Sequence, residues 1–129
     1  MAQASIVHSD WDFEVERGPG WLFVRPRRCG SSDAGTPTFA EYVWALLQQH
    51  FTNRLVLELG QLDRLDSHLV TQLLWLHKRV QARDGVIRLS ELSAENEDVL
   101  RACGLEGQFP PHRNREEAVM GRSHPHQPR

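Results

Sequence analysis

The sequence lacks long apolar segments, and this lack excludes a protein that spans a membrane. No apolar run in the 129 residues approaches the roughly 20 residues that a helix needs to cross a bilayer. The opening stretch, MAQASIVHSDWDFE, also lacks the basic and then apolar order of a signal peptide. We therefore expect a soluble protein that resides in the cytoplasm.

Cysteine is scarce as well, because the chain contains only Cys29 and Cys103. The two lie far apart, with neither a CxxC pair nor another paired-ligand spacing, so they indicate neither a disulfide framework nor a zinc centre. We expect reduced thiols, with Cys103 as a small residue of the core. Three histidines near the C-terminus, His112, His124 and His126, lack a rigid scaffold and a fourth ligand, so we expect no bound metal and no other cofactor.

The sequence also lacks a strong excess of charge of one sign. Fifteen basic residues stand against 17 acidic ones, for a net charge of −2. Such a balance offers no general attraction to a phosphate backbone or an anionic bilayer, so we expect neither nucleic acid nor a membrane as partner. Hydrophobic residues at 40% and charged residues at 25% are ordinary for a globular protein, and 129 residues suit one domain.

Both ends of the chain are without a periodic apolar pattern. We expect a flexible N-terminus over residues 1–10, a folded domain over 11–120 and a disordered tail, GRSHPHQPR, over 121–129. Within the domain, residues 27–38 read RRCGSSDAGTPT, which is dense in Gly, Ser and Pro and therefore predicts an exposed loop.

The first half of the domain shows two apolar patterns. Alternating apolar residues on both sides of the turn sequence RGPG at 17–20 predict a β-hairpin. Apolar residues at three- and four-residue steps predict a helix that begins after Thr38. The hairpin pattern consists of Phe13, Val15, Trp21, Phe23 and Pro26, and the helical pattern of Phe39, Val43, Leu46, Leu47 and His50.

The second half alternates strands and helices. The apolar run Leu55–Leu59 predicts a buried central strand, and leucines and valines at helical spacing predict a long helix from about Ser67 to Ala82. The further predictions are a strand at 86–89, a helix from Ser93 to Leu100 capped by Gly104, a brief edge strand at 108–109 and one or two helical turns at 115–120.

This order of elements predicts the fold class. Strands separated by helices imply right-handed crossovers, which make the strands near residues 55 and 86 parallel, whereas the opening hairpin is antiparallel. We therefore predict an α/β fold with a mixed, mostly parallel sheet of four to five strands, an N-terminal hairpin and about four helices.

From Leu55 to Val119 the chain resembles the STAS domain, the fold of the bacterial anti-sigma factor antagonists. In that family a buried strand leads through a short loop to an Asp-Ser pair at the start of a long helix, and here LVLEL leads through GQLDRL to Asp66 and Ser67. The other matching features are a glycine turn, a strand, a Gly-Leu pair, a phenylalanine and an acidic pair before alanine. They correspond here to Gly85, Val86–Leu89, Gly104 and Leu105, Phe109, and Glu116, Glu117 and Ala118.

The resemblance implies a regulator of transcription that binds other proteins. Its implied partner is an anti-sigma factor or a serine kinase of the switch type, with phosphorylation of Ser67. The implied partner-binding residues are Asp63, Asp66, Ser67, His68 and Leu69. The usual family motif is Asp-Ser-Ser-Gly, so His68 and Leu69 replace its second serine and its glycine.

Ser67 has two interpretations. A serine at a helix start can accept a hydrogen bond from a backbone N–H two or three residues later, which stabilises by about 1 kcal/mol. A phosphate acceptor at the same place would bring about −1.5 to −2 charges to a helix N-terminus, which the helix dipole tolerates. Because Asp63, Asp66 and Glu58 make the surroundings acidic, release of a docked partner is the predicted consequence.

The sequence leaves other functions to weigh. Asp66, Ser67 and His68 suggest a hydrolase, but consecutive residues at a helix start point in different directions and form no relay, so we expect no catalysis. Two alternatives stay open: a non-phosphorylated scaffold subunit that assembles with other STAS domains, and a sensor that holds a small anion or nucleotide at the helix N-terminus.

Aromatic residues add candidates for an interface. The chain has four tryptophans, for which core packing is the usual role, and we expect one or two of them to serve as interface anchors. Trp44 lies off the helical stripe, and it and Trp75 are the candidates. We expect His68 at the rim of the docking surface, and His77 partly buried without a metal.

Overall fold

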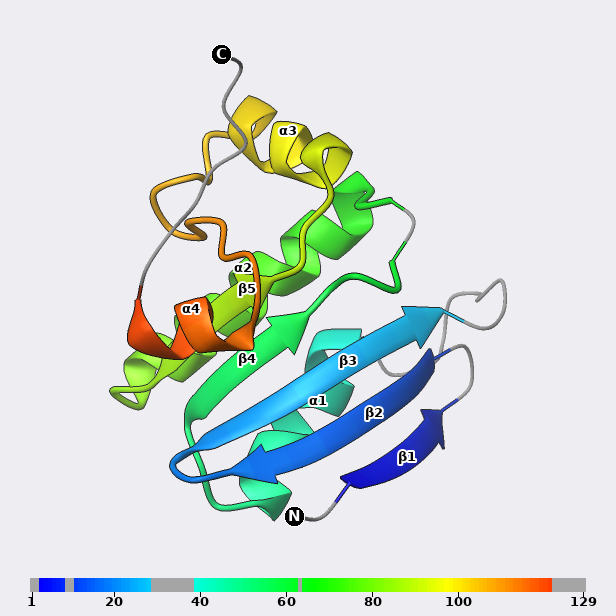
Figure 1. Ribbon diagram of the computed structural model, residues 1–129, viewed down its shortest axis with the longest axis vertical. Helices are drawn as coiled ribbons and strands as arrows, with labels where there is room; N and C mark the ends of the chain where they lie inside the picture. The colour runs from blue at the N-terminus through cyan, green and yellow to red at the C-terminus, as the bar shows by residue number, and fades with distance from the viewer. Residues whose placement is uncertain (1–2, 9–10, 29–38, 63, 122–129) are drawn as a thin grey trace.

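Five strands form one sheet in the order β1-β2-β3-β4-β5, and four helices accompany it (Figure 1). The computed structural model describes residues 3–8, 11–28, 39–62 and 64–121, and these counts refer to those ranges. The strands are β1 (Gln3–His8), β2 (Trp11–Gly18), β3 (Trp21–Arg28), β4 (Arg54–Glu58) and β5 (Val86–Ser90). The helices are α1 (Phe39–Gln49), α2 (Ser67–Ala82), α3 (Ala94–Ala102) and α4 (Arg115–Met120).

The predicted hairpin is confirmed. Strands β2 and β3 pair antiparallel, with Gly18 opposite Trp21, so only Pro19 and Gly20 lie between them. Gly20 has a φ of 77°, a conformation that glycine adopts without steric cost, which is why the turn can be this short.

The N-terminal segment adds a strand that the apolar pattern did not predict. Strand β1 pairs antiparallel with β2 along its whole length, from Gln3 opposite Glu16 to His8 opposite Trp11. An edge strand of this kind is held by backbone hydrogen bonds to its neighbour, and these do not require an apolar pattern in its own sequence. The fold therefore includes part of the segment that we expected to be flexible.

The other half of the sheet is parallel, as the alternation of strands and helices predicts. Strand β4 pairs parallel with β3 on one side and with β5 on the other, and α2 forms the crossover from β4 to β5. Leu55, Val56 and Leu57 are fully buried, as expected of an internal strand. Two of the four pairings between named strands are parallel and two are antiparallel, so the predicted mixed sheet is confirmed.

One glycine is required by the close approach between α2 and β4. Gly85 follows α2, and a Cβ atom there would lie 2.3 Å from the carbonyl oxygen of Asn53. The same carbonyl accepts a hydrogen bond from the backbone N–H of Val86 at 2.9 Å, which starts β5 beside β4. Any side chain at position 85 would therefore separate the two strands.

The two faces of the sheet are covered differently. Helices α1 and α2 lie behind the sheet in Figure 1 and bury the main core, whereas α4 lies in front of β4 and β5. Under α4 there is only a small apolar cluster, built from Phe23, Val56 and Ala118 with Trp21 and Val119 beside them. The attachment of α4 therefore depends more on polar contacts than that of α1 or α2.

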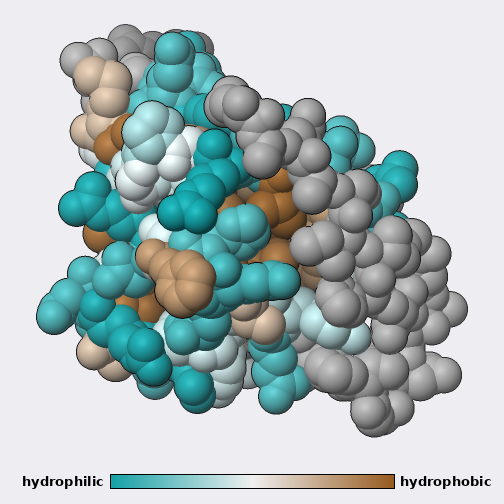
Figure 2. Space-filling view, turned by 90° about the horizontal axis from the view of Figure 1, so that it is seen from below, coloured by the Kyte–Doolittle hydropathy of each residue, from teal (hydrophilic) through white to brown (hydrophobic). Residues whose placement is uncertain are grey.

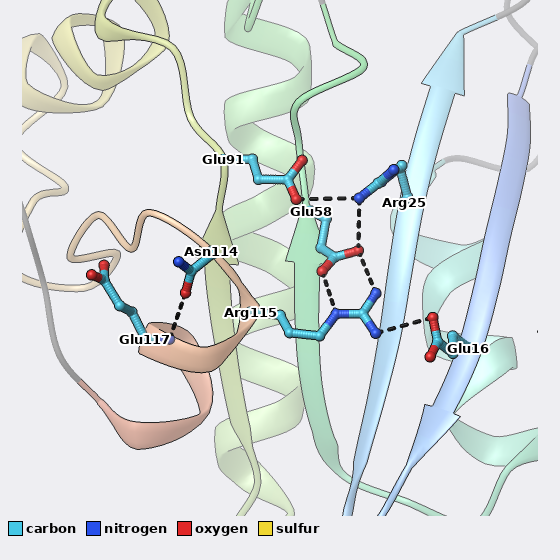
Figure 3. A network of polar contacts seen from close by, with 7 residues as sticks. All are labelled: Glu16, Arg25, Glu58, Glu91, Asn114, Arg115 and Glu117. Atoms are coloured by element: carbon cyan, nitrogen blue, oxygen red, sulfur yellow. Dashed lines mark hydrogen bonds and ion pairs between the residues drawn. The ribbon is translucent and has the colours of Figure 1, made fainter. Parts of the chain in front are cut away.

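Those polar contacts centre on Glu58 of β4, which is only 2% exposed (Figure 3). Arg115 at the start of α4 donates two hydrogen bonds to the Glu58 carboxylate, at 2.8 and 2.9 Å, and its third nitrogen lies 3.0 Å from Glu16. Arg25 lies 3.5 Å from Glu58 and 3.2 Å from Glu91. The hydrogen bonds to Glu58 raise the pKa of Arg115 above its ordinary value.

Two expectations about the C-terminal half are wrong. Cys103 is exposed rather than part of the core, because it is the cap residue of α3 and Leu100 and Leu105 are the buried residues there. Residues 108–109 form no strand, because the N–H groups of Gln108 and Phe109 both donate to the Leu105 carbonyl in a turn. Cys29 lies outside the described residues.

Phe109 is instead a core residue, 1% exposed. Its ring meets His77 edge to face at a centroid distance of 5.0 Å. Burial lowers the pKa of His77, which favours the neutral imidazole. The predicted glycine after α3 is confirmed, since Gly104 has a φ of 73°.

Candidate functional site

The segment between β4 and α2 is anchored by buried leucines. Leu59 is 1% exposed and Leu65 is 2% exposed, and both face the main core. The Leu59 N–H donates to the Ser90 carbonyl, and the Leu65 N–H donates to the Asn96 side-chain oxygen, each at 2.9 Å. These contacts hold the chain on both sides of residue 63 and set where the first turn of α2 emerges.

Asp66 is the cap residue of that turn. Its backbone is extended, with a φ of −97° and a ψ of 174°, and its side chain accepts a hydrogen bond from the Leu69 N–H at 2.8 Å. Its second carboxylate oxygen lies 3.7 Å from Arg28 at the end of β3. The interpretation of Ser67 as the cap is therefore wrong, because the Asp66 side chain is the one that accepts the hydrogen bond from the Leu69 N–H.

Ser67 is the first residue of α2 and is exposed. Its carbonyl accepts a hydrogen bond from the Thr71 hydroxyl at 3.0 Å, but within the described residues no hydrogen bond involves its own hydroxyl. A serine in this position has neither a capping role nor a role in the core. Ser67 is exposed and directly follows the cap residue Asp66 in the chain.

The other predicted site residues divide into two groups. His68 is exposed beside Ser67, so Asp66, Ser67 and His68 form one continuous exposed turn, which we call the Ser67 surface. Leu69 is 1% exposed and packs in the main core, so it supports this surface from below and is not available to a partner. Asp63 lies outside the described residues.

The electrostatics of the Ser67 surface differ from the sequence-based expectation. Glu58 adds no acidic surface there, because it is buried on the opposite side of the sheet and paired with Arg115 and Arg25. Arg28, which sequence reasoning did not connect with the site, lies beside Asp66 instead. The contact arises because β3 and β4 are parallel neighbours, and no local sequence pattern indicates it.

The capping geometry predicts different stability effects for two neighbouring substitutions. Asp66→Ala removes the acceptor of the Leu69 N–H and should lower the free energy of unfolding by about 1 kcal/mol. Ser67→Ala removes an exposed hydroxyl and should change it by less than about 0.5 kcal/mol. Urea unfolding of both variants measures the difference, and an equal loss in the two would contradict this assignment of the cap.

Neither a metal centre nor a membrane-spanning helix is found among the described residues. Within the described ranges, no group of three or more His, Cys, Asp or Glu side chains is arranged to hold a metal ion. In the same part of the chain, no helix combines the length and apolarity needed to cross a membrane.

Comparisons with known proteins agree with the fold. The family model described as STAS domain matches residues 31–118, which is more than half of the chain. The NMR structure of the protein TM1081 superimposes with a TM-score of 0.68 at 16% identity, covering 82% of this chain and 84% of that one.

A second solved structure, the crystal structure of an anti-sigma factor antagonist from Mycobacterium paratuberculosis, superimposes with a TM-score of 0.67 at 16% identity and covers 93% of each chain. A comparison with curated protein sequences gives no match. At this level of identity the two structures establish the fold, and the family model, which matches more than half of the chain, establishes the family. The chain belongs to the STAS domain family.

Proposed function

We propose that this STAS domain is a non-catalytic regulatory module that docks an anti-sigma factor or a related switch kinase through the Ser67 surface. Phosphorylation of Ser67 would release the partner. The domain would act in the cytoplasm of a bacterium and regulate transcription there. The observation that carries it is the exposed serine Ser67, which comes directly after the cap residue Asp66 at the start of α2.

The local structure is compatible with a phosphate at Ser67. The first turn of α2 presents backbone N–H groups and the positive end of the helix dipole, both of which favour an anion. Arg28, at 3.7 Å from Asp66, and the exposed Arg64 supply positive charge nearby. The fold should therefore tolerate the phosphate, whereas a partner docked on the same turn would have to desolvate the added charge.

The two departures from the family motif have different consequences for docking. Leu69, in place of the motif glycine, is buried, so its side chain changes the core and not the surface offered to a partner. His68, in place of the second motif serine, is exposed and changes that surface. Selectivity among partners should therefore depend on His68 more than on Leu69.

The proposal is tested by phosphorylation in vitro. Incubation with the cognate kinase and ATP, followed by tryptic mass spectrometry, should place one phosphate on Ser67 and none on the Ser67→Ala variant. Ser93 is a matched control, because it is also an exposed serine at a helix start but its hydroxyl caps α3 by accepting from Asn96. Ser93→Ala should be phosphorylated normally, and incorporation at Ser93 or elsewhere would reject the switch.

A further inference from the structure

An exposed phenylalanine occupies a strained backbone position at the end of α1. The Phe51 N–H donates to the Gln48 carbonyl at 3.2 Å and the Thr52 N–H donates to the Leu47 carbonyl at 3.1 Å, which closes the helix in a Schellman turn. Phe51 takes the left-handed position of that turn, with a φ of 53°, where glycine is the usual residue. Phe51 is 91% exposed, so its ring gains little from burial within the described fold.

The phenyl ring stands beside a groove between the C-terminal ends of α1 and α2. The groove has a volume of about 410 Å³, and its lining includes Trp44, Leu47, Phe51 and Arg83. Figure 2 views the molecule from the end at which α1 terminates, and there apolar side chains interrupt a mostly hydrophilic surface. The lining is mixed, because Trp44, Leu47 and Phe51 share it with the polar side chains of Gln48, Thr52, Asn53 and Arg83.

Two arginines at the C-terminal end of α2, Arg79 and the cap residue Arg83, stack on indole rings near this groove. The Arg79 guanidinium lies between Trp44 and Trp75, at 4.8 and 4.9 Å from their ring centroids, and the Arg83 guanidinium lies 5.4 Å from Trp44. A guanidinium stacked on a ring keeps its N–H groups at the edge, where they can bind carboxylates. Neither arginine forms an ion pair with any described carboxylate.

This region, which we call the Trp44 surface, consists of Trp44, Phe51, Trp75, Arg79 and Arg83. It is separate from the Ser67 surface, because Arg79 follows Ser67 along α2 by about 18 Å at roughly 1.5 Å per residue. The exposed Lys78 adds a third cation on the same helix. The carboxylates nearest to these residues in the described sequence are Asp84, just after α2, and Glu41, one turn before Trp44 on α1. The surface is therefore cationic and aromatic.

We propose that the Trp44 surface is a second docking site, which binds an acidic segment of a partner protein. The segment places one bulky apolar side chain in the groove beside Phe51 and carboxylates on Arg79 and Arg83. An acidic partner is expected because its carboxylates match the positive charges of Arg79 and Arg83. The exposed ring of Phe51, held in a strained backbone position, supplies an apolar contact that the isolated domain does not use. The inference does not depend on phosphorylation of Ser67.

The test uses a blocked hexapeptide of Glu and Asp around one Leu, titrated into the full chain. Indole N–H resonances of Trp44 and Trp75 should shift saturably, and the affinity should fall as salt is raised. Phe51→Gly should weaken binding about tenfold and raise the melting temperature, because glycine removes the contact and the strain together. A peptide with Lys in place of the acidic residues should produce no shift.

Asp84→Gly is the matched control, because Asp84 takes the same left-handed position at the end of α2 with a φ of 58°. It should also raise the melting temperature but leave peptide binding at least as tight. Absence of a saturable shift in the wild type, or unchanged binding by Phe51→Gly, would overturn the proposal. Self-association that Phe51→Gly abolishes would also overturn it, since the occupant would then be a second copy of this chain.

Discussion

Ser67→Asp should weaken the complex with the anti-sigma factor or switch kinase by about tenfold or more while leaving the domain folded. The new carboxylate sits at the first residue of α2, where the helix dipole and free N–H groups stabilise it. A docked partner must strip water from this charge and from Asp66 beside it, and that cost appears only in the complex. Isothermal titration calorimetry measures the affinity, and thermal unfolding monitors the fold.

Two controls separate charge from shape and from position. Ser67→Asn has nearly the size of aspartate without its charge and should retain most of the affinity. Ser93→Asp adds the same charge at the start of α3, where aspartate is a good cap, and should affect neither stability nor binding. If Ser67→Asp bound the partner as tightly as the wild type, docking would not take place at the Ser67 surface.

Arg115→Met should destabilise the domain by about 2–4 kcal/mol, the largest stability effect that the structure predicts for a charged residue. The substitution removes both short hydrogen bonds to Glu58 and leaves a carboxylate that is 2% exposed with only Arg25, at 3.5 Å. Removing one partner of a buried pair leaves a desolvated charge uncompensated. Urea unfolding followed by circular dichroism measures the loss.

A double variant and a surface variant control this prediction. Glu58→Leu combined with Arg115→Met leaves no unpaired charge and should recover most of the stability, because an apolar pair can replace a buried ion pair. Arg101→Met removes the exposed contacts to Asp98 and Glu106 and should leave stability nearly unchanged. Equal losses for Arg115→Met and Arg101→Met would show that Glu58 is not effectively buried.

The importance of Arg115 follows from the uneven cover of the sheet. Helix α4 is only six residues long and meets the sheet over a small apolar cluster. The ion pairs in Figure 3 attach its start, and a hydrogen bond from Arg88 of β5 to the Ala118 carbonyl, at 2.6 Å, attaches its end. Arg115 also stacks on Phe23, with its guanidinium carbon 4.2 Å from the ring centroid. Loss of this residue should therefore loosen α4 before it affects α1 or α2.

Local patterns in the sequence were sufficient for most of the elements. The leucine and valine spacing after Asp66 predicts a helix from about Ser67 to Ala82, and α2 has these bounds. The turn sequence at 17–20 and the glycine after α3 were interpreted correctly as well. Such features depend on residues within a few positions of one another, so they can be read without knowledge of the fold.

Features that depend on distant residues were missed or misplaced. Strand β1 needs the edge of β2, the Arg28 contact with Asp66 needs β3 beside β4, and the burial of Glu58 needs α4 to bring Arg115 over it. Cys103 is apolar enough for a core, but only the course of the chain after α3 decides that it faces solvent.

The sequence by itself determined the order of elements, the Asp66 and Ser67 pair and its place at the start of a helix, because these are local. The tertiary structure alone decided which side chains of that turn are accessible, with Leu69 buried and Ser67 exposed. It also brought Trp44 of α1 against Arg79 and Arg83 of α2. The physical reason is that accessibility and stacking between helices follow from packing, which joins residues far apart in the chain.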